Sequence, residues 1–354
     1  MSESENIIAE TAQRIFADLA DPQTINRAAD GEWKKPLWDT LVAAGLPLAW
    51  VPEQHGGAGA SLSDGFAILS VAGRFALPVP LAETLLAGWL LSAAGISAPP
   101  GAMTVAPVRP GDRIVLNSDG TLSGSARGVP FGREAGHFAV LAHGSDGASV
   151  ALVAAGACRL TEGRTLAGDA SDQVAFERVK PITLAPVPAG FDQTTLMLMG
   201  ATARSVEMAG ALETILALSV RYANERVAFE RAIAKFQAVQ HNLARLAGEV
   251  AAAVTAAGSA ADTIAVAERF DDMVFLEAAS AKIRSAEAAE QGVAIAHQVH
   301  GAIGFTKEHV LHRFTLRLLS WRDDFGNESQ WAVELGNKVA ARGADELWPL
   351  LASR

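Results

Sequence analysis

The sequence predicts an α+β fold in which an N-terminal helical domain, a small antiparallel β-domain and a C-terminal helical bundle follow one another. Apolar residues keep helical spacing over the first hundred residues, short alternating strands with turn dipeptides come next, and long alanine- and leucine-rich segments with helical spacing fill the remainder. The 354 residues exceed twice a domain of roughly 150, so we expect several domains. We place them at 1–101, 102–188 and 189–354, the last of four-helix-bundle type.

Composition excludes several classes of protein. Half of the residues are hydrophobic and 19% are charged, which is ample for an ordered core. A net charge of -10 and a pI near 5.3 argue against nucleic-acid binding, which needs a basic face. No apolar run approaches the roughly 20 residues of a membrane span, and the polar, acidic start MSESENIIAE does not resemble a signal peptide. We therefore expect a cytoplasmic protein without a membrane partner.

The single cysteine limits the chemistry further. Cys158 has no second cysteine with which to form an intramolecular disulfide or a multi-cysteine metal site. It follows an apolar strand, so we interpret it as a small buried hydrophobe rather than a nucleophile.

The first hundred residues predict three helices. Apolar residues over 33–42 recur every three or four positions. The glycines of 54–64 predict an irregular loop, and Ser61 or Ser63 can cap the helix that follows. A third helix is expected through 81–90.

Two aspartate–glycine pairs predict β-hairpins in the middle of the chain, because glycine adopts a positive φ at little cost. Asp119-Gly120 lies between strands expected at 113–116 and 121–123, and Asp146-Gly147 between strands at 137–142 and 149–154. A further strand is expected at 172–179, and the proline-bearing stretch 181–188 is interpreted as a linker.

The last part of the chain is expected to be helical. The expected helical segments are 194–256, 261–299 and 327–352, punctuated by Gly258 and by Gly301 with Gly304.

Common cofactor and metal motifs are absent from the sequence. No GxGxxG or Walker loop follows a predicted strand. His297 and His300 are three residues apart, which could place both on one helical face, but no nearby carboxylate joins them. We expect no metal site.

The segment that begins at Arg226 is a candidate ligand-binding face. If it is helical, Arg226, Ile233 and Gln237 fall on neighbouring turns of one face and offer a cation, an apolar step and an amide. That combination suits a ligand that carries a phosphate beside a planar ring, because guanidinium pairs with phosphate oxygens. The alternative is a surface arginine and glutamine that flank core Phe229 and Ile233.

A second candidate segment covers 298–305. Its glycines lie between two helical stretches and would let the backbone approach a ligand or a partner closely. The alternative is a simple helix break with a glycine C-cap.

Taken together and in order, these segments resemble the acyl-CoA dehydrogenase family. LWDTLVAAGLPLAWVPEQHGGAGASLSD resembles the family's entry segment, RVAFERAIAKFQAVQHNLARLAGEV its flavin-binding arginine helix, and QVHGAIGFTKEH its glutamine- and glycine-bearing loop. The predicted order of helices, β-domain and helices is also the order of the family. The resemblance implies an FAD-dependent enzyme that introduces an α,β-double bond into an acyl-CoA thioester, with electron-transfer flavoprotein as acceptor.

The resemblance also assigns cofactor contacts residue by residue. Arg226 matches the arginine that contacts the FAD pyrophosphate, Phe229 the aromatic residue beside it, and Gln237 a glutamine that reaches the cofactor. Gln298 and Ala302, with the adjoining Gly301, match positions that a neighbouring subunit contributes to the same FAD. A homo- or hetero-oligomer is therefore implied.

The usual catalytic base is missing from this sequence. The position of the family's glutamate is Phe325, and the alternative base position of some members aligns with Ala203. Asp323, Asp324 and Glu328 lie beside the vacant position, and each is either a substitute base or part of a solvated acidic turn. Asp324 is our first choice because it adjoins Phe325.

Two functions remain open. The first is an acyl-CoA dehydrogenase with its own catalytic carboxylate, acting alone or in a complex. The second is a non-catalytic partner subunit that completes the FAD site at an interface. The short chain, the missing glutamate and a reduced β-domain resemble members that assemble from two unlike subunits, one setting for which is lipid or steroid catabolism.

Overall fold

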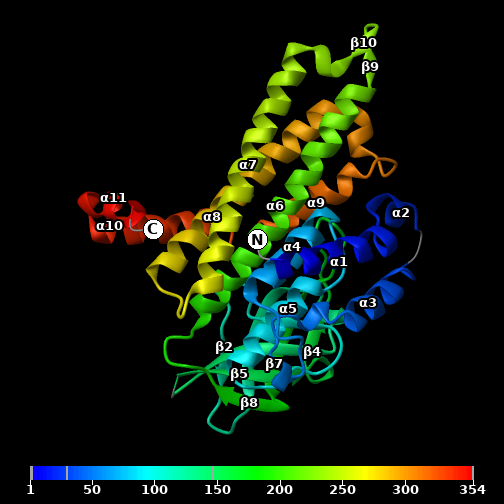
Figure 1. Ribbon diagram of the computed structural model, residues 1–354. Coiled ribbons are helices and arrows are strands. Elements are labelled where there is room, and N and C mark those ends of the chain that lie inside the picture. The colour runs from blue at the N-terminus through cyan, green and yellow to red at the C-terminus, as the bar shows by residue number, and fades with distance from the viewer. Residues whose placement is uncertain (1–2, 29–30, 146, 353–354) are drawn as a thin grey trace.

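The computed structural model describes residues 3–28, 31–145 and 147–352. Figure 1 shows helices of the N-terminal part in the middle, the sheet at the bottom, and two long antiparallel helices that rise above both. The predicted α+β order of helices, sheet and helices is confirmed. The eight described strands of the sheet domain lie between helical parts that end at Ala93 and resume at Gln193. We retain 1–101, 102–188 and 189–354 as proposed domain bounds.

The N-terminal part contains the predicted helices. Ser61 rather than Ser63 caps the helix after the glycine loop: its Oγ accepts a hydrogen bond from the Asp64 N–H at 3.1 Å, and the Asp64 carboxylate accepts from the Ser61 N–H at 3.0 Å. The helices are α1 (Glu3–Leu19), α2 (Pro22–Arg27), α3 (Lys34–Ala43), α4 (Leu62–Arg74) and α5 (Leu81–Ala93), with short 3-10 turns at Leu46–Leu48 and Glu53–His55.

The middle part forms one mixed sheet. Its strands are β1 (Met103–Ala106), β2 (Ile114–Leu116), β3 (Leu122–Pro130), β4 (His137–Gly144), β5 (Gly147–Ala154), β6 (Arg159–Thr161), β7 (Ser171–Val179) and β8 (Thr183–Pro186). They lie in the order β6-β7-β3-β2-β4-β5-β8, with β1 beside β4. Both predicted hairpins form, although Asp146 lies outside the described residues. The sheet is not purely antiparallel, since β1 and β2 both run parallel to β4.

The predicted linker at 181–188 is wrong in part, because it contains β8. This strand pairs antiparallel with β5, with Leu184 opposite Ala151. Proline is tolerated in an edge strand, where one side of the backbone needs no partner.

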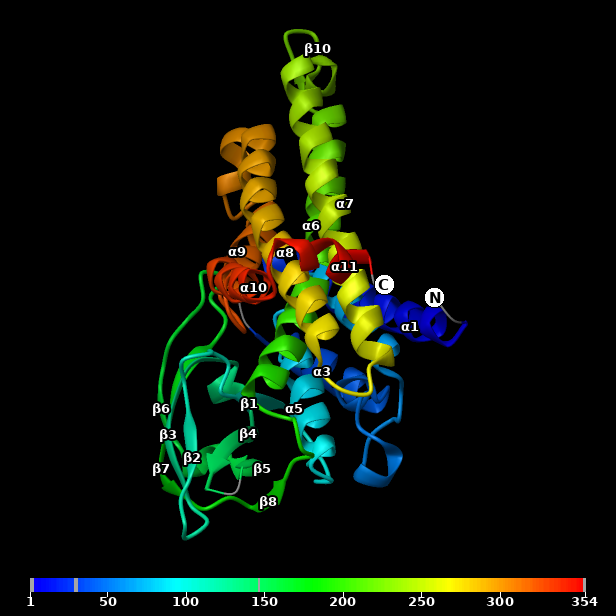
Figure 2. The ribbon, with the colours of Figure 1, turned by 90° about the vertical axis from the view of Figure 1, so that its left-hand side faces the viewer.

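The C-terminal part is helical, and its breaks differ from those predicted. Gly258 lies inside a helix, and the predicted segment 194–256 is divided in two by 226–236. Figure 2 shows the two resulting helices side by side, with their turn at the top. The helices are α6 (Gln193–Glu225), α7 (Gln237–Val266), α8 (Asp272–His300), α9 (Leu311–Trp321), α10 (Glu328–Arg342) and α11 (Leu347–Ala352), with a 3-10 turn at Gly301–Phe305.

The segment after α6 is a tight hairpin instead of a helix. β9 (Val227–Ala228) pairs antiparallel with β10 (Arg231–Ala232). Phe229 and Glu230 form its turn with φ of 50° and 66°. The prediction that Arg226, Ile233 and Gln237 share a helical face is therefore wrong, because left-handed backbone at two successive residues ends the helix.

Helix α7 bears on the membrane prediction. Within the described residues it is the one helix that is long and apolar enough to cross a membrane, by length and composition alone. In this fold it packs against α6 and α8, and about a third of its apolar window is buried within the chain.

Candidate functional site

The end of the bundle farthest from the sheet carries the predicted cofactor residues. Arg226 caps α6 through its own N–H, which donates to the Tyr222 carbonyl at 2.9 Å, while its side chain is exposed and makes no ion pair with any described residue. The Tyr222 ring stacks on His300 with centroids 4.5 Å apart. Since Gly301 follows His300, this stacking brings the two candidate segments to the same end of the molecule.

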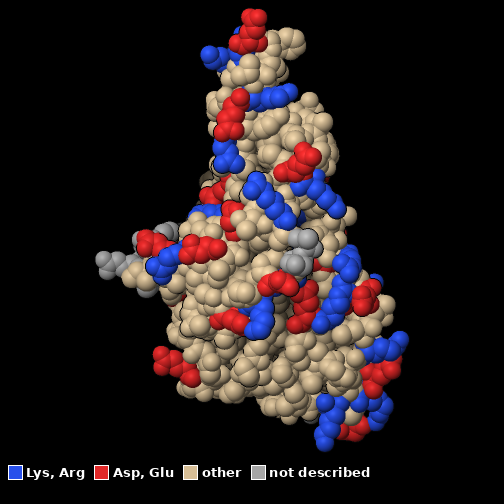
Figure 3. Space-filling model, turned by 90° about the vertical axis from the view of Figure 1, so that its right-hand side faces the viewer, with Lys and Arg blue, Asp and Glu red and all other residues tan. Residues whose placement is uncertain are grey.

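The remaining predicted contacts are also solvent-facing. Gln237, Gln298 and Ala302 are exposed, and Phe229 is 89% exposed, so the alternative that Phe229 is a core residue is wrong. Gly301 has a φ of 64°, and nothing lies within 4 Å of the position that a Cβ would take. Figure 3 shows positive and negative side chains together at the upper tip, where β9 and β10 lie.

These features fit a phosphate-bearing dinucleotide. An arginine without an ionic partner can bind a phosphate by donating hydrogen bonds to its oxygens, and a glycine with no atoms near its Cβ position lets a ligand approach the backbone. Because these side chains are exposed, the chain by itself does not enclose a ligand here.

The position of the missing base is filled by packing. Phe325 is fully buried with a φ of 55°, and its ring lies against Gly200 on α6 so closely that a Cβ on Gly200 would be 2.2 Å from it. The Phe325 N–H donates to the Val108 carbonyl of the β1–β2 loop at 3.2 Å. Ala203, the aligned alternative, is buried in α6. No proton acceptor occupies either position.

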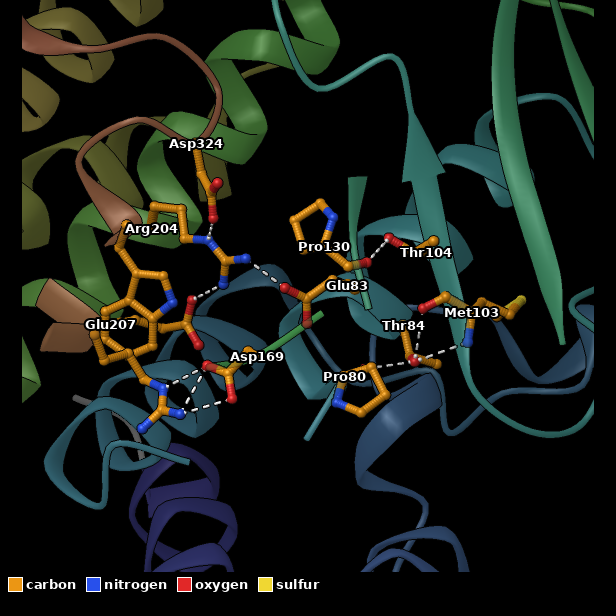
Figure 4. Close-up of polar contacts among 12 residues, drawn as sticks. Pro80, Glu83, Thr84, Met103, Thr104, Pro130, Asp169, Arg204, Glu207 and Asp324 are labelled. Carbon is orange, nitrogen blue, oxygen red and sulfur yellow. Dashed lines mark hydrogen bonds and ion pairs between the residues drawn. The ribbon is translucent and has the colours of Figure 1, made fainter. Parts of the chain in front are cut away.

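Asp324 belongs to a buried ion cluster (Figure 4). Arg204 on α6, 2% exposed, donates through Nε to the Asp324 carboxylate at 2.9 Å and through a terminal nitrogen to Glu207 at 2.6 Å. Its other terminal nitrogen donates to Glu83 on α5. One guanidinium therefore joins the N-terminal helices, α6 and the turn before Phe325.

Burial dominates the electrostatics of this cluster. It raises the pKa of Glu83 and raises that of Glu207 to about 7, although Arg204 opposes both shifts. Burial also lowers the pKa of Lys282, which lies beside Asp324, to about 7. The three carboxylates of Glu83, Glu207 and Asp324 thus lie around the Arg204 guanidinium, with Lys282 beside Asp324.

The other acidic candidates lie outside the core. Asp323 is exposed, whereas Glu328 is ion-paired with Arg322. Burial raises the pKa of Glu328, but the hydrogen bond and charge of Arg322, a backbone hydrogen bond and the charge of Lys282 together outweigh burial, and the pKa is lowered overall. Burial raises the pKa of the Cys158 thiol to about 11, which disfavours a reactive thiolate. Within the described residues no group of three or more potential ligands could hold a metal.

A large cavity lies beside the Phe325 turn. It has a volume of about 610 Å³ and is mostly apolar. Its walls come from the β1–β2 loop and from the first turns of α6, α8 and α10, including Pro110, Gln193, Met197, Phe275, Ser329 and Trp331. A cavity of this size accommodates a planar cofactor ring.

This cavity and the Arg226 surface lie at opposite ends of α6. Met197 and Arg226 are 29 residues apart, which at 1.5 Å per residue is about 43 Å along the helix. In Figure 2 the hairpin tip is at the top and the sheet at the bottom, at opposite ends of the molecule.

Comparisons with known proteins agree with this architecture. A model of the acyl-CoA dehydrogenase N-terminal domain matches residues 2–98, and a model of the C-terminal domain matches residues 189–323. The chain belongs to the acyl-CoA dehydrogenase family. Its activity is therefore the FAD-dependent oxidation of a CH–CH bond of an acyl-CoA, as the resemblance implied.

Several relatives cover nearly the whole chain. It is 28% identical over 352 residues to acyl-CoA dehydrogenase IpdE2 of Mycobacterium tuberculosis, with 98% of each chain covered. It is similar to the ChsE4-ChsE5 complex of the same organism (TM-score 0.85, 23% identity, 96% of this chain and 98% of that chain). It is also similar to a variant of the Tcur3481-Tcur3483 steroid ACAD (TM-score 0.81, 26% identity, with the same coverage).

The ion cluster was missed by reasoning from the sequence. Its members Glu83, Arg204, Glu207 and Lys282 are charged residues within otherwise apolar helical runs. Such positions indicate buried ion pairs, because a charged side chain on the buried face of a helix requires a partner of opposite charge. The identity of the partners depended on how α5, α6 and α8 cross.

Proposed function

We propose that this chain is one subunit of an FAD-dependent acyl-CoA dehydrogenase in which each flavin is shared with another acyl-CoA dehydrogenase-like chain, and that the other chain supplies the catalytic base. The observation that carries the proposal is the position of the two candidate cofactor surfaces at opposite ends of α6.

The separation argues for sharing. A distance of about 43 Å exceeds the length of an extended FAD, so Arg226 cannot contact the phosphates of a flavin whose ring lies in the cavity of the same chain. Arg226, Gln237, Gln298, Gly301 and Ala302 would instead hold the phosphate and adenosine parts of a flavin whose ring lies in another chain. The open shape of this surface supports the same assignment.

The packing around Phe325 argues that the base lies elsewhere. Abstraction of an α-proton needs an acceptor beside the thioester, and Phe325 has none. The Asp324 carboxylate is already engaged by Arg204, whose Nε donates to it at 2.9 Å, so it would have to leave this ion pair to meet a substrate proton. Asp324 as the base stays a prediction that mutation can test.

FAD, when bound, supplies the acceptor for the hydride that leaves the β-carbon. The tasks proposed for this chain are to pair its arginine with phosphate, to present backbone at Gly301, and to shield the neighbouring site from water.

We further propose electron-transfer flavoprotein as the electron acceptor and a cytoplasmic location. The substrates to test include steroid-derived acyl-CoA, because one similar structure is described as a steroid ACAD.

The test is to produce the chain alone and together with an acyl-CoA dehydrogenase-like chain encoded beside it. We expect little flavin in the chain alone, and flavin that acyl-CoA bleaches in the mixed assembly. An Arg226→Ala chain in the same assembly is the matched control and should lower the flavin content. Stoichiometric flavin that acyl-CoA bleaches in the chain alone would contradict the proposed division of roles.

A further inference from the structure

Lys282 is a buried lysine that the cofactor assignment does not use. It lies on α8 with no exposed surface, and its Nζ donates to the Trp321 carbonyl at 2.7 Å and to the Asp324 carbonyl at 2.8 Å. These carbonyls lie at and just after the end of α9, where a helix leaves its last carbonyls without internal partners. Lys282 therefore fastens the start of the turn that joins α9 to α10.

That turn has a backbone that needs external support. Phe325 has a φ of 55° and Gly326 a φ of 90°, so two successive residues are left-handed. A bulky residue in this region is strained and persists only where the surroundings hold it. The two hydrogen bonds from Lys282 provide such support immediately before Phe325.

The Phe325 turn also positions one wall of the cavity. The Trp331 indole N–H donates to the Phe325 carbonyl at 3.0 Å, and Trp331 lines the 610 Å³ cavity together with Ser329 and Gln330. A continuous series of contacts thus runs from Lys282 through the turn to the indole ring. Loss of the first contact would release the ring.

We propose that Lys282 is a positioning residue for the cavity, acting through the Phe325 turn and Trp331, and that the tightness of flavin binding therefore follows the charge of its ammonium group. The inference rests on the proposed function and adds that this chain's own cavity also holds a flavin ring, whose phosphates are bound by the other chain.

Burial and the charged groups around Lys282 set the pH at which its ammonium group loses its proton. Asp324, Asp323 and Glu328 face it from the turn and α10, and Arg204 from α6. Burial is the largest effect and lowers the pKa of Lys282 to about 7, so the ammonium is lost as the pH rises through neutrality. The hydrogen bonds to the two carbonyls then weaken, because a charged donor is stronger than a neutral one.

The experiment uses the flavin-loaded assembly and measures FAD dissociation between pH 6 and 8.5. In the wild type we expect affinity to fall at least threefold over this range. Lys282→Met should bind FAD at least tenfold more weakly at pH 6 and lose the pH dependence, whereas Lys35→Met, at an exposed lysine of α3, should match the wild type. A folded Lys282→Met assembly with wild-type affinity and pH profile would overturn the proposal.

A second variant and a flavin-free readout cover the other outcomes. Trp331→Phe keeps the lysine but removes the indole donor, and we expect it to weaken FAD binding and to abolish the pH dependence. The fluorescence difference between wild type and Trp331→Phe, recorded without flavin, should change with a midpoint near pH 7. If that difference is constant with pH, the proposal fails even where Lys282→Met does not fold. If wild type binds no flavin in any assembly, the proposed function fails, and the fluorescence still decides on Lys282.

Discussion

Glu207 offers a quantitative test of the buried cluster. Glu207→Gln preserves the size of the side chain and a carbonyl oxygen that can accept the 2.6 Å hydrogen bond from Arg204, but it cannot ionise. In the folded protein the pKa of Glu207 is raised, mainly by burial, to about 7 from an ordinary 4.5. Between these values the folded state holds a proton that the unfolded chain releases, so stability falls as the pH rises from 4.5 to 7.

The size of the effect follows from the shift. At 1.36 kcal/mol per unit, the wild type should lose about 3 kcal/mol relative to the variant across this window. For a protein of this length that corresponds to about 4 °C in Tm. We therefore expect the Tm of Glu207→Gln minus that of wild type to be more positive at pH 8 than at pH 5, by about that amount.

The assay is thermal unfolding at pH 5 and pH 8 at one scan rate. Glu213→Gln is the matched control, because it removes a carboxylate from the same helix that pairs with Arg74 at the surface. A Tm difference between Glu207→Gln and wild type that is equal at the two pH values would refute the reasoning, since it would show that Glu207 does not hold a proton in the fold.

Further predictions concern the flavin, the base and the packing. Arg226→Ala should weaken FAD binding by at least tenfold through loss of a charge-assisted contact of about 1.5–3 kcal/mol, and Arg226→Lys should retain only part of the wild-type affinity. Unchanged flavin content in absorbance spectra would show that Arg226 does not bind the FAD phosphate. Asp324→Asn should leave the rate of flavin bleaching by acyl-CoA within a few-fold of wild type, whereas a loss of about 10²–10⁴ in stopped-flow would identify Asp324 as the base. Gly200→Ala should destabilise the fold by about 1–3 kcal/mol, because its Cβ would meet the Phe325 ring at 2.2 Å, and Gly248→Ala on α7, where space is open, should not; equal urea midpoints would contradict this packing.

Periodicity and turn residues were enough to predict the order of the fold. Helical spacing located α3, α4 and α5, and both aspartate–glycine hairpins formed. The turn at Phe229 and Glu230 was not predicted, because neither residue favours a positive φ and helical spacing continues on both sides. The β8 strand was not predicted, because the prolines in and beside it, Pro181, Pro186 and Pro188, are also typical of a linker.

The candidate site was predicted only as separate segments. Arg226, Gln298 and Gly301 lie at one end of the bundle of a single chain, whereas the resemblance assigned Gln298 and Gly301 to a neighbouring subunit. Their distance from the cavity depended on the lengths of the helices. The surroundings of Asp324 were beyond the sequence for another reason. Arg204 lies 120 residues away, and their ion pair exists only because α6 passes the α9–α10 turn.

The central claim is that one flavin is held by two chains. The most direct measurement is the structure of the assembled, flavin-bound enzyme, determined by cryo-electron microscopy or crystallography. The account predicts an FAD whose phosphates contact Arg226 of this chain while its flavin ring lies in the cavity of a different chain, more than 40 Å from the Met197 end of the same α6. An FAD whose ring and phosphates both contact one copy of this chain, with Arg226 facing solvent, would contradict it.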